Sequence, residues 1–243
     1  MDQTYESKYH DLEATHPWFL GRRHMIIRLL RGTDRNQKIL EIGCSAGYLL
    51  EILKKYGFQN LFGIDISREA VELCRKKGID QVFQMDAADP KFSNNEFDLI
   101  IASDILEHMP DDVAAMKKWY KILKPGGKLI VFTPAFNFLW TEHDEINHHF
   151  SRYTKKKLSE IFRVTGFATL RISYWNFILF FPTVVIRFFH RVLVKKRHKT
   201  HDHLYRMNSL ARVLFLGLLQ FENLLLEFIN FPIGVSVFGV VKK

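Results

Sequence analysis

The sequence contains only two cysteines, Cys44 and Cys74, among its 243 residues. Two cysteines cannot form the disulfide framework that is typical of small secreted domains, and this fits a reducing compartment. The first twenty residues are polar and acidic, so they lack the basic start and apolar core of a secretory signal peptide. These two absences lead us to expect a cytoplasmic protein.

Long apolar runs are also absent. A membrane-spanning helix needs about 20 apolar residues, but the run over 174–186 is interrupted by Arg187, and the stretch 208–230 contains Arg212, Gln220, Glu222 and Glu227. We therefore expect no clean membrane span. Acidic residues number 26 against 35 lysines and arginines, which gives a net charge of +9. This excess favours an anionic partner, such as nucleic acid, a phospholipid surface or a phosphorylated substrate.

Short apolar segments alternate with helical patterns along most of the chain. The apolar segments are continuous rather than alternating, which is typical of a parallel sheet covered by helices on both faces. A helical segment over residues 1–36, ended by Gly32, precedes this region. We expect strands over 38–42, 60–65, 81–87, 97–104, 127–134, 169–175 and 234–243, and helices over 48–56, 68–78, 111–123 and 154–167, the last with Thr154 as N-cap.

The stretch LEIGCSAGY, residues 40–48, fits two kinds of site. Residues Gly43 to Gly47 match G-x-S-x-G, which would make Ser45 the nucleophile of a serine hydrolase. However, that motif follows a later strand of the sheet in hydrolases, whereas this loop follows the first. As a glycine turn after a buried strand, the loop instead indicates nucleotide binding. Asp65, 22 residues after Gly43 at the end of the next strand, supports this interpretation because an acid there binds ribose hydroxyls.

Five stretches resemble, in order, the motifs of class I S-adenosylmethionine-dependent methyltransferases: LEIGCSAGYLL, GIDIS, QMDAAD, FDLIIASDILEHMPD and LKPGGKLIVFTPAF. The G-x-G-x-x-G pattern of dinucleotide dehydrogenases is absent. The resemblance implies an α/β fold, a Rossmann-like seven-stranded, mostly parallel sheet with helices on both faces, and S-adenosylmethionine as cofactor. It implies cofactor contacts from Glu41 and Gly43 (methionine part), Gly47, Asp65 (ribose), Ile66 and Asp86 (adenine), Ala87 and Ser103 (beneath the sulfonium).

Acids and histidines follow the fourth and fifth expected strands, in SDILEHMPDD and WTEHDEINHHFSRYT. They resemble those of small-RNA 2′-O-methyltransferases, which implies that Asp104, Glu107, His108 and His149 hold Mg²⁺ or Mn²⁺. The first acid departs from that pattern because Asp104 is one carbon shorter. Leu-Glu-His also occurs in quinone and small-molecule methyltransferases with no known metal, where His108 would act as a base. The candidate catalytic residues are therefore His108, Glu107 and His149, and a purely structural role also stays open.

An insertion separates the last two expected strands, so the sequence divides into a helical cap (1–36), a cofactor-binding core (37–173), an amphipathic helical insertion (174–232) and a final core strand (233–243). We expect two helices in the insertion, forming either a lid or a hairpin on an anionic membrane surface. Each carries a polar stripe: Thr183, Arg187, His190, Arg191 and Lys195, then Ser209, Arg212, Gln220, Asn223, Glu227 and Asn230. A basic cluster follows the first: Lys195, Lys196, Arg197 and Lys199.

Three hypotheses for function follow. The first is an O-methyltransferase that acts on a lipid-linked or amphipathic small molecule at the cytoplasmic membrane face. HPWFLGRR and HHFSRYT also resemble type-11/12 methyltransferases linked to envelope glycolipids, although ordinary surface positions are expected for Arg22 and Arg23. The second is a metal-dependent RNA 2′-O-methyltransferase, disfavoured because no stacking-aromatic RNA module is visible. The third is a non-catalytic cofactor-binding scaffold at a membrane.

Overall fold

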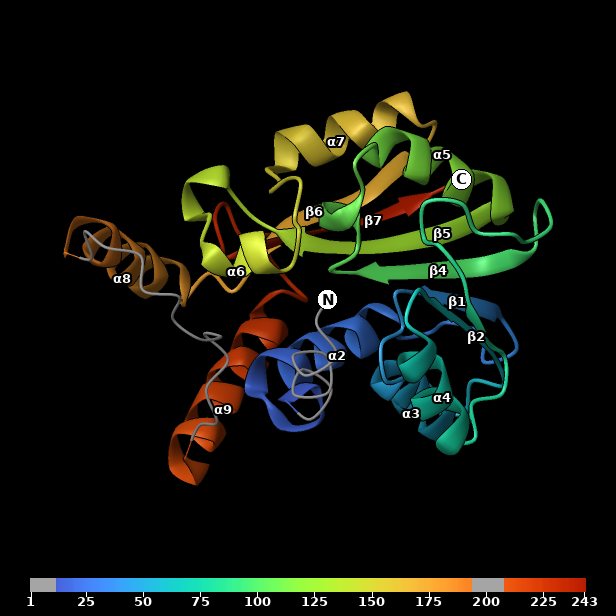
Figure 1. The fold of residues 1–243 in the computed structure, drawn as a ribbon, viewed down its shortest axis with the longest axis horizontal. Coiled ribbons are helices and arrows are strands. Elements are labelled where there is room, and N and C mark those ends of the chain that lie inside the picture. The colour runs from blue at the N-terminus through green and yellow to red at the C-terminus, as the bar shows by residue number, and fades with distance from the viewer. Residues whose placement is uncertain (1–11, 194–207) are drawn as a thin grey trace.

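In this computed structural model, which describes residues 12–193 and 208–243, seven strands form one sheet in the order β3-β2-β1-β4-β5-β7-β6. Figure 1 shows the central strands of this sheet. Strands β1 to β5 run parallel, and β7 runs antiparallel to both β5 and β6. The predicted fold class is confirmed. The strands are β1 (Lys38–Ile42), β2 (Asn60–Asp65), β3 (Val82–Gln84), β4 (Phe97–Ser103), β5 (Leu123–Pro134), β6 (Ala168–Trp175) and β7 (Ser236–Lys242).

Helices cover both faces of the sheet. In Figure 1, α5 (Asp112–Ile122) and α7 (Lys155–Val164) lie on one face, and α2 (Pro17–Leu29), α3 (Tyr48–Lys55) and α4 (Arg68–Lys76) lie on the other. Thr154 is the N-cap of α7, as predicted, and accepts a hydrogen bond from the Lys157 amide. The cap predicted over residues 1–36 corresponds to a short helical stretch at 12–15 and to α2, and residues 1–11 lie outside the described residues.

The central strands are buried on both faces, which explains their continuous apolar sequences. Leu40 in β1 pairs with Ile100 in β4, which in turn pairs with Leu129 in β5, and all three side chains are fully buried. Because these strands are parallel and in register, their carboxyl ends meet at one edge of the sheet. This edge is where ligands bind in open α/β folds.

Short helices after β4 and β5 were not predicted as such. They are η1 (Leu106–His108), η2 (Asn137–Leu139) and α6 (Glu142–Ile146). The α6 helix begins with a capping box, in which Thr141 and Asp144 each satisfy the backbone amide of the other. The segment that the sequence indicates as a polar loop is thus held in a defined shape close to the carboxyl edge of the sheet.

The insertion contains α8 (Phe180–Leu193) and α9 (Ser209–Leu225). The α9 helix packs along α2, whereas α8 points in a different direction (Figure 1). The close packing depends on Gly21, because a Cβ there would lie 2.7 Å from Cδ1 of Leu219. Asn223 joins the two helices to the sheet: it donates to the Gly21 carbonyl at 2.8 Å and accepts from the Trp175 indole at 2.7 Å. The two predicted helices of the insertion are thus present in the described residues, and the choice between a lid and a membrane-surface hairpin stays a prediction.

The C-terminal part of the predicted polar stripe, from Gln220 in α9 to Asn230 just after it, faces the rest of the protein, whereas Ser209 and Arg212 at the start of α9 are exposed. Gln220 contacts His24 at 3.3 Å, Glu227 pairs with Arg28 and Arg31, and Asn230 accepts from Arg171 at 2.8 Å. The apolar side of the helix is consequently left exposed. Within the described residues, no helix has the length and apolar character needed to cross a membrane. The predicted basic cluster at Lys195, Lys196, Arg197 and Lys199 lies outside the described residues.

Candidate functional site

A large cavity of about 1740 Å³ opens at the carboxyl edge of the sheet. A single small ligand needs about 300–1,000 Å³, so this cavity has room for two ligands side by side. Most of the predicted cofactor contacts border it, although Gly47 is not among the described lining residues. Those that border the cavity are Glu41, Gly43, Asp65, Ile66, Asp86, Ala87 and Ser103.

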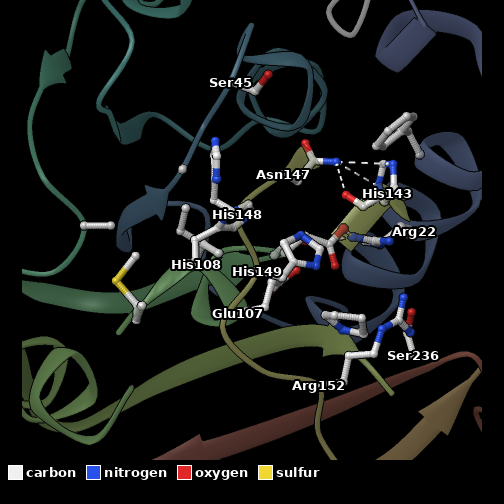
Figure 2. A pocket seen from close by; sticks show the side chains of 18 of the residues that line it. Arg22, Ser45, Glu107, His108, His143, Asn147, His148, His149, Arg152 and Ser236 are labelled. Carbon is white, nitrogen blue, oxygen red and sulfur yellow. Dashed lines mark hydrogen bonds and ion pairs between the residues drawn. The ribbon is translucent and has the colours of Figure 1, made fainter. Parts of the chain in front are cut away.

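The loop after β1 requires glycine at both of its ends. Gly43 and Gly47 adopt positive φ values of 71° and 74°, and a Cβ would lie 2.8 Å from Ile105 Cδ1 or 2.6 Å from Cys74 Sγ respectively. Between them, the Ser45 amide donates to Asp65 Oδ2 at 2.8 Å, and the Ser45 hydroxyl donates to Glu13 at 2.7 Å (Ser45 is shown in Figure 2). The loop is thereby fixed to the end of β2.

Glu41, next to the last residue of β1, is a buried acid on the cavity wall. Burial, together with the nearby charge of Glu13, raises its pKa well above the usual range, although Arg23 opposes this shift. Its Oε2 atom finds no hydrogen-bond partner among the described residues. A buried acid with an unsatisfied oxygen is costly unless a ligand supplies a donor.

His149 and Asp144 form a hydrogen-bonded pair in the same cavity. His149 Nδ1 lies 2.8 Å from Asp144 Oδ1. The Arg152 guanidinium donates hydrogen bonds to both oxygens of this carboxylate, to Oδ1 at 2.8 Å and to Oδ2 at 2.9 Å, and the Thr141 amide donates to Oδ2 at 2.7 Å. Burial alone would raise the pKa of Asp144, but the hydrogen bonds from His149 and Arg152 outweigh it and hold the pKa well below its usual range. The ionised carboxylate fixes the proton of His149 on Nδ1 and leaves Nε2 able to accept a proton.

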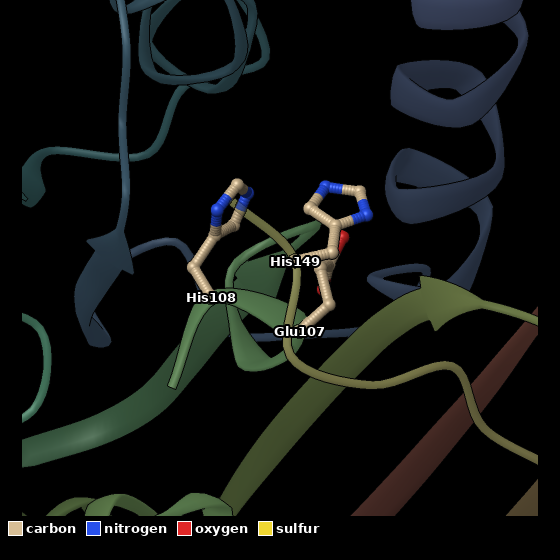
Figure 3. Close-up of side chains that lie close together, drawn as sticks. All are labelled: Glu107, His108 and His149. Carbon is tan, nitrogen blue, oxygen red and sulfur yellow. The ribbon is translucent and has the colours of Figure 1, made fainter. Parts of the chain in front are cut away.

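Glu107 and His108 lie beside His149 (Figures 2 and 3). The rings of His108 and His149 meet edge to face, 4.6 Å between centroids. Burial raises the pKa of Glu107 to about 8 and lowers the pKa of His108 to about 4, the latter with a contribution from His149. At neutral pH, Glu107 is therefore protonated and His108 is neutral.

The three residues could hold a cation, because one ligand atom from each of Glu107, His108 and His149 lies within 4.8 Å of the others. The predicted fourth ligand, Asp104, does not belong to this group. It adopts a left-handed conformation (φ 54°) just after β4, and its carboxylate pairs with Arg22. The structure thus brings together three of the four predicted ligands, and Arg22, which is distant in sequence, pairs with the carboxylate of the fourth.

Arg22 and Arg23 are buried rather than ordinary surface residues, which corrects the expectation from sequence. Arg22 is only 4% exposed and stacks over the rings of Trp18 and Trp175, 5.4 Å from each centroid. It also donates to Ser103 Oγ at 3.3 Å. Both arginines line the cavity.

Sequence reasoning placed Asp144 only in a polar loop and missed Arg152 altogether. The T-x-x-D pattern of residues 141–144 is a signal that could have identified Asp144, because it predicts a helix start and fixes the direction of the acid. No comparable local signal identifies Arg152, which meets Asp144 only because the chain turns back after α6.

Comparison with known families decides what kind of site this is. A family model described as a methyltransferase domain matches residues 19–172, more than half of the chain. The chain belongs to the S-adenosylmethionine-dependent methyltransferase family. This membership removes the serine-hydrolase interpretation of Ser45, and it favours an enzyme over a non-catalytic scaffold.

Curated relatives of this methyltransferase include two named ubiquinone biosynthesis O-methyltransferases. The protein from Idiomarina loihiensis is 29% identical over 166 residues, which span 60% of this chain and 66% of the relative. The protein from Xanthomonas oryzae pv. oryzae is 31% identical over 102 residues, which span 40% of this chain and 42% of the relative. The matched region thus covers less than two thirds of either relative.

Solved structures confirm the fold. A Thermotoga maritima protein described as a possible histamine N-methyltransferase aligns with a TM-score of 0.63 at 18% identity, covering 99% of this chain and 95% of that one. Phosphoethanolamine N-methyltransferase 2 of Haemonchus contortus, in complex with phosphomonomethylethanolamine and S-adenosylhomocysteine, aligns with a TM-score of 0.58 at 21% identity, covering 91% and 52%. At these identities the likeness concerns the fold alone.

Proposed function

We propose that this protein transfers the methyl group of S-adenosylmethionine to an oxygen of a small amphipathic or lipid-linked acceptor at a membrane surface. The observation that carries the proposal is the pair formed by His149 and Asp144. This pair lies in the same cavity as the glycine loop, and the cavity is large enough to hold an acceptor beside the cofactor. A hydroxyl acceptor needs a general base because the hydroxyl oxygen is a weak nucleophile until its proton is removed.

The residues of the glycine loop suit the cofactor. The unsatisfied oxygen of Glu41 supports a role in accepting a hydrogen bond from the amino group of the methionine part. Asp65, anchored by the Ser45 amide, is the proposed partner of the ribose hydroxyls. Ile66, 73% exposed on the cavity wall, offers an apolar surface for the adenine, with Asp86 and Ala87 next to it. Ser103 borders the cavity at the end of β4, where the methyl group would lie.

In this proposal His149 removes the proton of the acceptor hydroxyl. When bound, S-adenosylmethionine would supply an electrophilic methyl group on a positively charged sulfur, and the sulfur would keep the electron pair of the carbon–sulfur bond and leave as a neutral thioether. The hydroxyl proton goes to His149 Nε2. Asp144 stabilises the imidazolium that forms, and Arg152 keeps Asp144 ionised and in place.

Glu107 and His108 are proposed to orient the acceptor. Glu107 is protonated at neutral pH because burial raises its pKa to about 8, so it can donate a hydrogen bond to the acceptor oxygen. His108 is neutral and can accept one from a neighbouring hydroxyl. The two groups would hold the acceptor oxygen in line with the methyl group, which is the main requirement for this transfer.

An amphipathic acceptor is favoured by the wall that α8 contributes. Thr183, Ile186 and Arg187 of α8 border the cavity. The Arg187 guanidinium donates to the Leu139 carbonyl and so joins α8 to the segment after β5. An apolar tail could therefore leave the cavity along an apolar helix while its polar head stays beside His149.

A second candidate arrangement uses a divalent cation, and the grouping of Glu107, His108 and His149 favours it. The hydrogen bond from His149 to Asp144 is also the outer contact that metal-binding histidines commonly make. A cation there would lower the pKa of the acceptor hydroxyl in place of a general base. RNA sugar ends remain the alternative acceptor for such a site, whereas the apolar wall from α8 suits a lipid tail better.

The test is methyl transfer from isotopically labelled S-adenosylmethionine to membrane-lipid and metabolite extracts, with mass spectrometry to locate the label. We expect an O-methylated amphipathic product, lost in His149→Ala and retained in His24→Ala, a control histidine on α2. Label on nitrogen or carbon alone would contradict the proposal. Treatment with a chelator separates the two arrangements, because full activity in the chelator leaves only the general base.

A further inference from the structure

Helices α8 and α9 display apolar side chains that the rest of the described protein does not cover. Phe188 on α8 is 62% exposed, and Phe228, just after α9, is 80% exposed. We define the apolar surface as these side chains and their exposed neighbours. It comprises Phe181, Val185, Ile186, Phe188 and Phe189 on α8, and Leu210, Val213, Leu214, Phe221 and Phe228 on or after α9.

The exposure follows from how α9 is attached. The two buried polar side chains of α9 are already hydrogen-bonded, because Asn223 bonds to Gly21 and Trp175, and Glu222 accepts from the amides of Phe177 and Ile178. Rotating α9 to hide its apolar side would break these bonds and bury unpaired polar groups, which is costly. The part of the apolar surface on α9 is therefore set by the way this helix is attached to the fold.

The positive charge of the sequence between α8 and α9 indicates which kind of partner would cover this surface. Residues 187–212, which lead from α8 into α9, contain eight lysines and arginines and a single acid, Asp202. The sequence of α8 contains no acidic residue, and the one acid within α9, Glu222, is buried. Two apolar helices joined by a basic stretch of sequence match the acyl chains and phosphate groups of an anionic lipid bilayer.

We infer that the apolar surface docks on an anionic membrane, with α8 and α9 lying in the interface rather than crossing it. This inference rests on the proposed function and identifies how its acceptor arrives. Ile186 belongs both to the apolar surface and to the cavity wall, so the docked cavity opens toward lipid. An acceptor can then present its head to His149 while its tail stays in the bilayer.

Sedimentation with vesicles tests the inference. The protein should bind vesicles of phosphatidylcholine mixed with phosphatidylglycerol at least about tenfold more tightly than vesicles of phosphatidylcholine alone, and less tightly at high salt. The double variant Phe188→Asp/Leu214→Asp should bind about tenfold or more weakly. Leu170→Asp, an equally exposed apolar position on β6, should bind like the wild type.

The contrary outcomes are equally specific. The inference would be refuted if the protein bound neither kind of vesicle. It would also be refuted if Leu170→Asp lost as much vesicle binding as the double variant. Light scattering that shows a stable dimer abolished by Phe188→Asp/Leu214→Asp, with no vesicle binding, would assign the surface to a second copy of the chain instead. Binding of S-adenosylmethionine, measured by calorimetry, and methyl transfer to the extract dispersed in detergent should persist in the double variant, so failure of docking is distinguishable from failure of the proposed function.

Discussion

Replacing Asp144 with asparagine should disable the proposed base without removing His149. Both oxygens of the carboxylate accept hydrogen bonds: Oδ1 from His149 Nδ1 and Arg152 Nε, and Oδ2 from Arg152 and the Thr141 amide. An amide has only one accepting oxygen. If its NH₂ group replaces Oδ1, it meets the Arg152 donor and forces Nδ1 to become the acceptor, so the proton moves to Nε2 and the base is lost.

If the NH₂ group replaces Oδ2 instead, it meets donors from both Arg152 and Thr141. In either orientation at least one charge-assisted hydrogen bond is lost, at about 1.5–3 kcal/mol each, and Arg152 keeps a buried charge without its counterion. We therefore expect the Asp144→Asn substitution to lower the free energy of unfolding by about 2–4 kcal/mol. Its kcat should fall by about 10²–10⁴-fold, the usual contribution of general base catalysis.

The assay is steady-state methyl transfer, with calorimetry for cofactor binding and chemical denaturation for stability. Glu160→Gln, an exposed acid on α7, is the matched control and should behave like the wild type. Acid sensitivity should change as well. The depressed pKa of Asp144 stabilises the wild type above the pKa of an unfolded aspartate, and this contribution disappears as the pH falls through the folded value. Undiminished kcat in Asp144→Asn, with normal cofactor affinity, would refute the reasoning.

Three further predictions follow from individual contacts. Asp65→Ala should weaken S-adenosylmethionine binding by about tenfold or more, because it removes a charge-assisted acceptor; unchanged affinity by calorimetry would contradict its role. Glu107 has a folded pKa of about 8, so wild-type stability should decline as the pH rises from the unfolded value toward 8, and thermal melts of Glu107→Gln should lack this decline. Gly21→Ala should destabilise the protein by about 1–3 kcal/mol, because the new Cβ would clash with Leu219. Gly217→Ala on α9 should instead stabilise the protein, because a Cβ there meets nothing within 4 Å. Chemical denaturation curves of the two variants test this difference.

The cofactor edge of the site could be predicted from sequence because its determinants are local. The glycine loop follows β1 directly, and Asp65 ends the next strand, so short-range patterns fix where these residues meet. The same holds for Glu107 and His108, which follow β4. Their neighbour His149 was also predicted, because a polar segment after β5 must reach the same edge of a parallel sheet.

Other parts of the site depend on contacts between distant segments. Arg22 meets Asp104 across 82 positions of the sequence, so no local pattern shows that this carboxylate is occupied. The periodicity of α9 in the sequence predicts that the helix has one polar and one apolar side. It does not predict which of the two sides faces the rest of the protein. The polar side faces inward because α2 and the end of β6 offer it partners such as Gly21 and Trp175.

The position of β7 has a consequence for the order in which the protein folds. This strand lies between β5 and β6, yet both α8 and α9 come before it in the chain. During synthesis, β6 therefore emerges before β7, which is its neighbour in the described sheet, and the position beside β5 stays empty while the insertion is made. Closing it requires a pairing of long sequence separation, which is intrinsically slow. The ribosome thus presents α8 and α9 to their surroundings before the sheet that anchors them is complete.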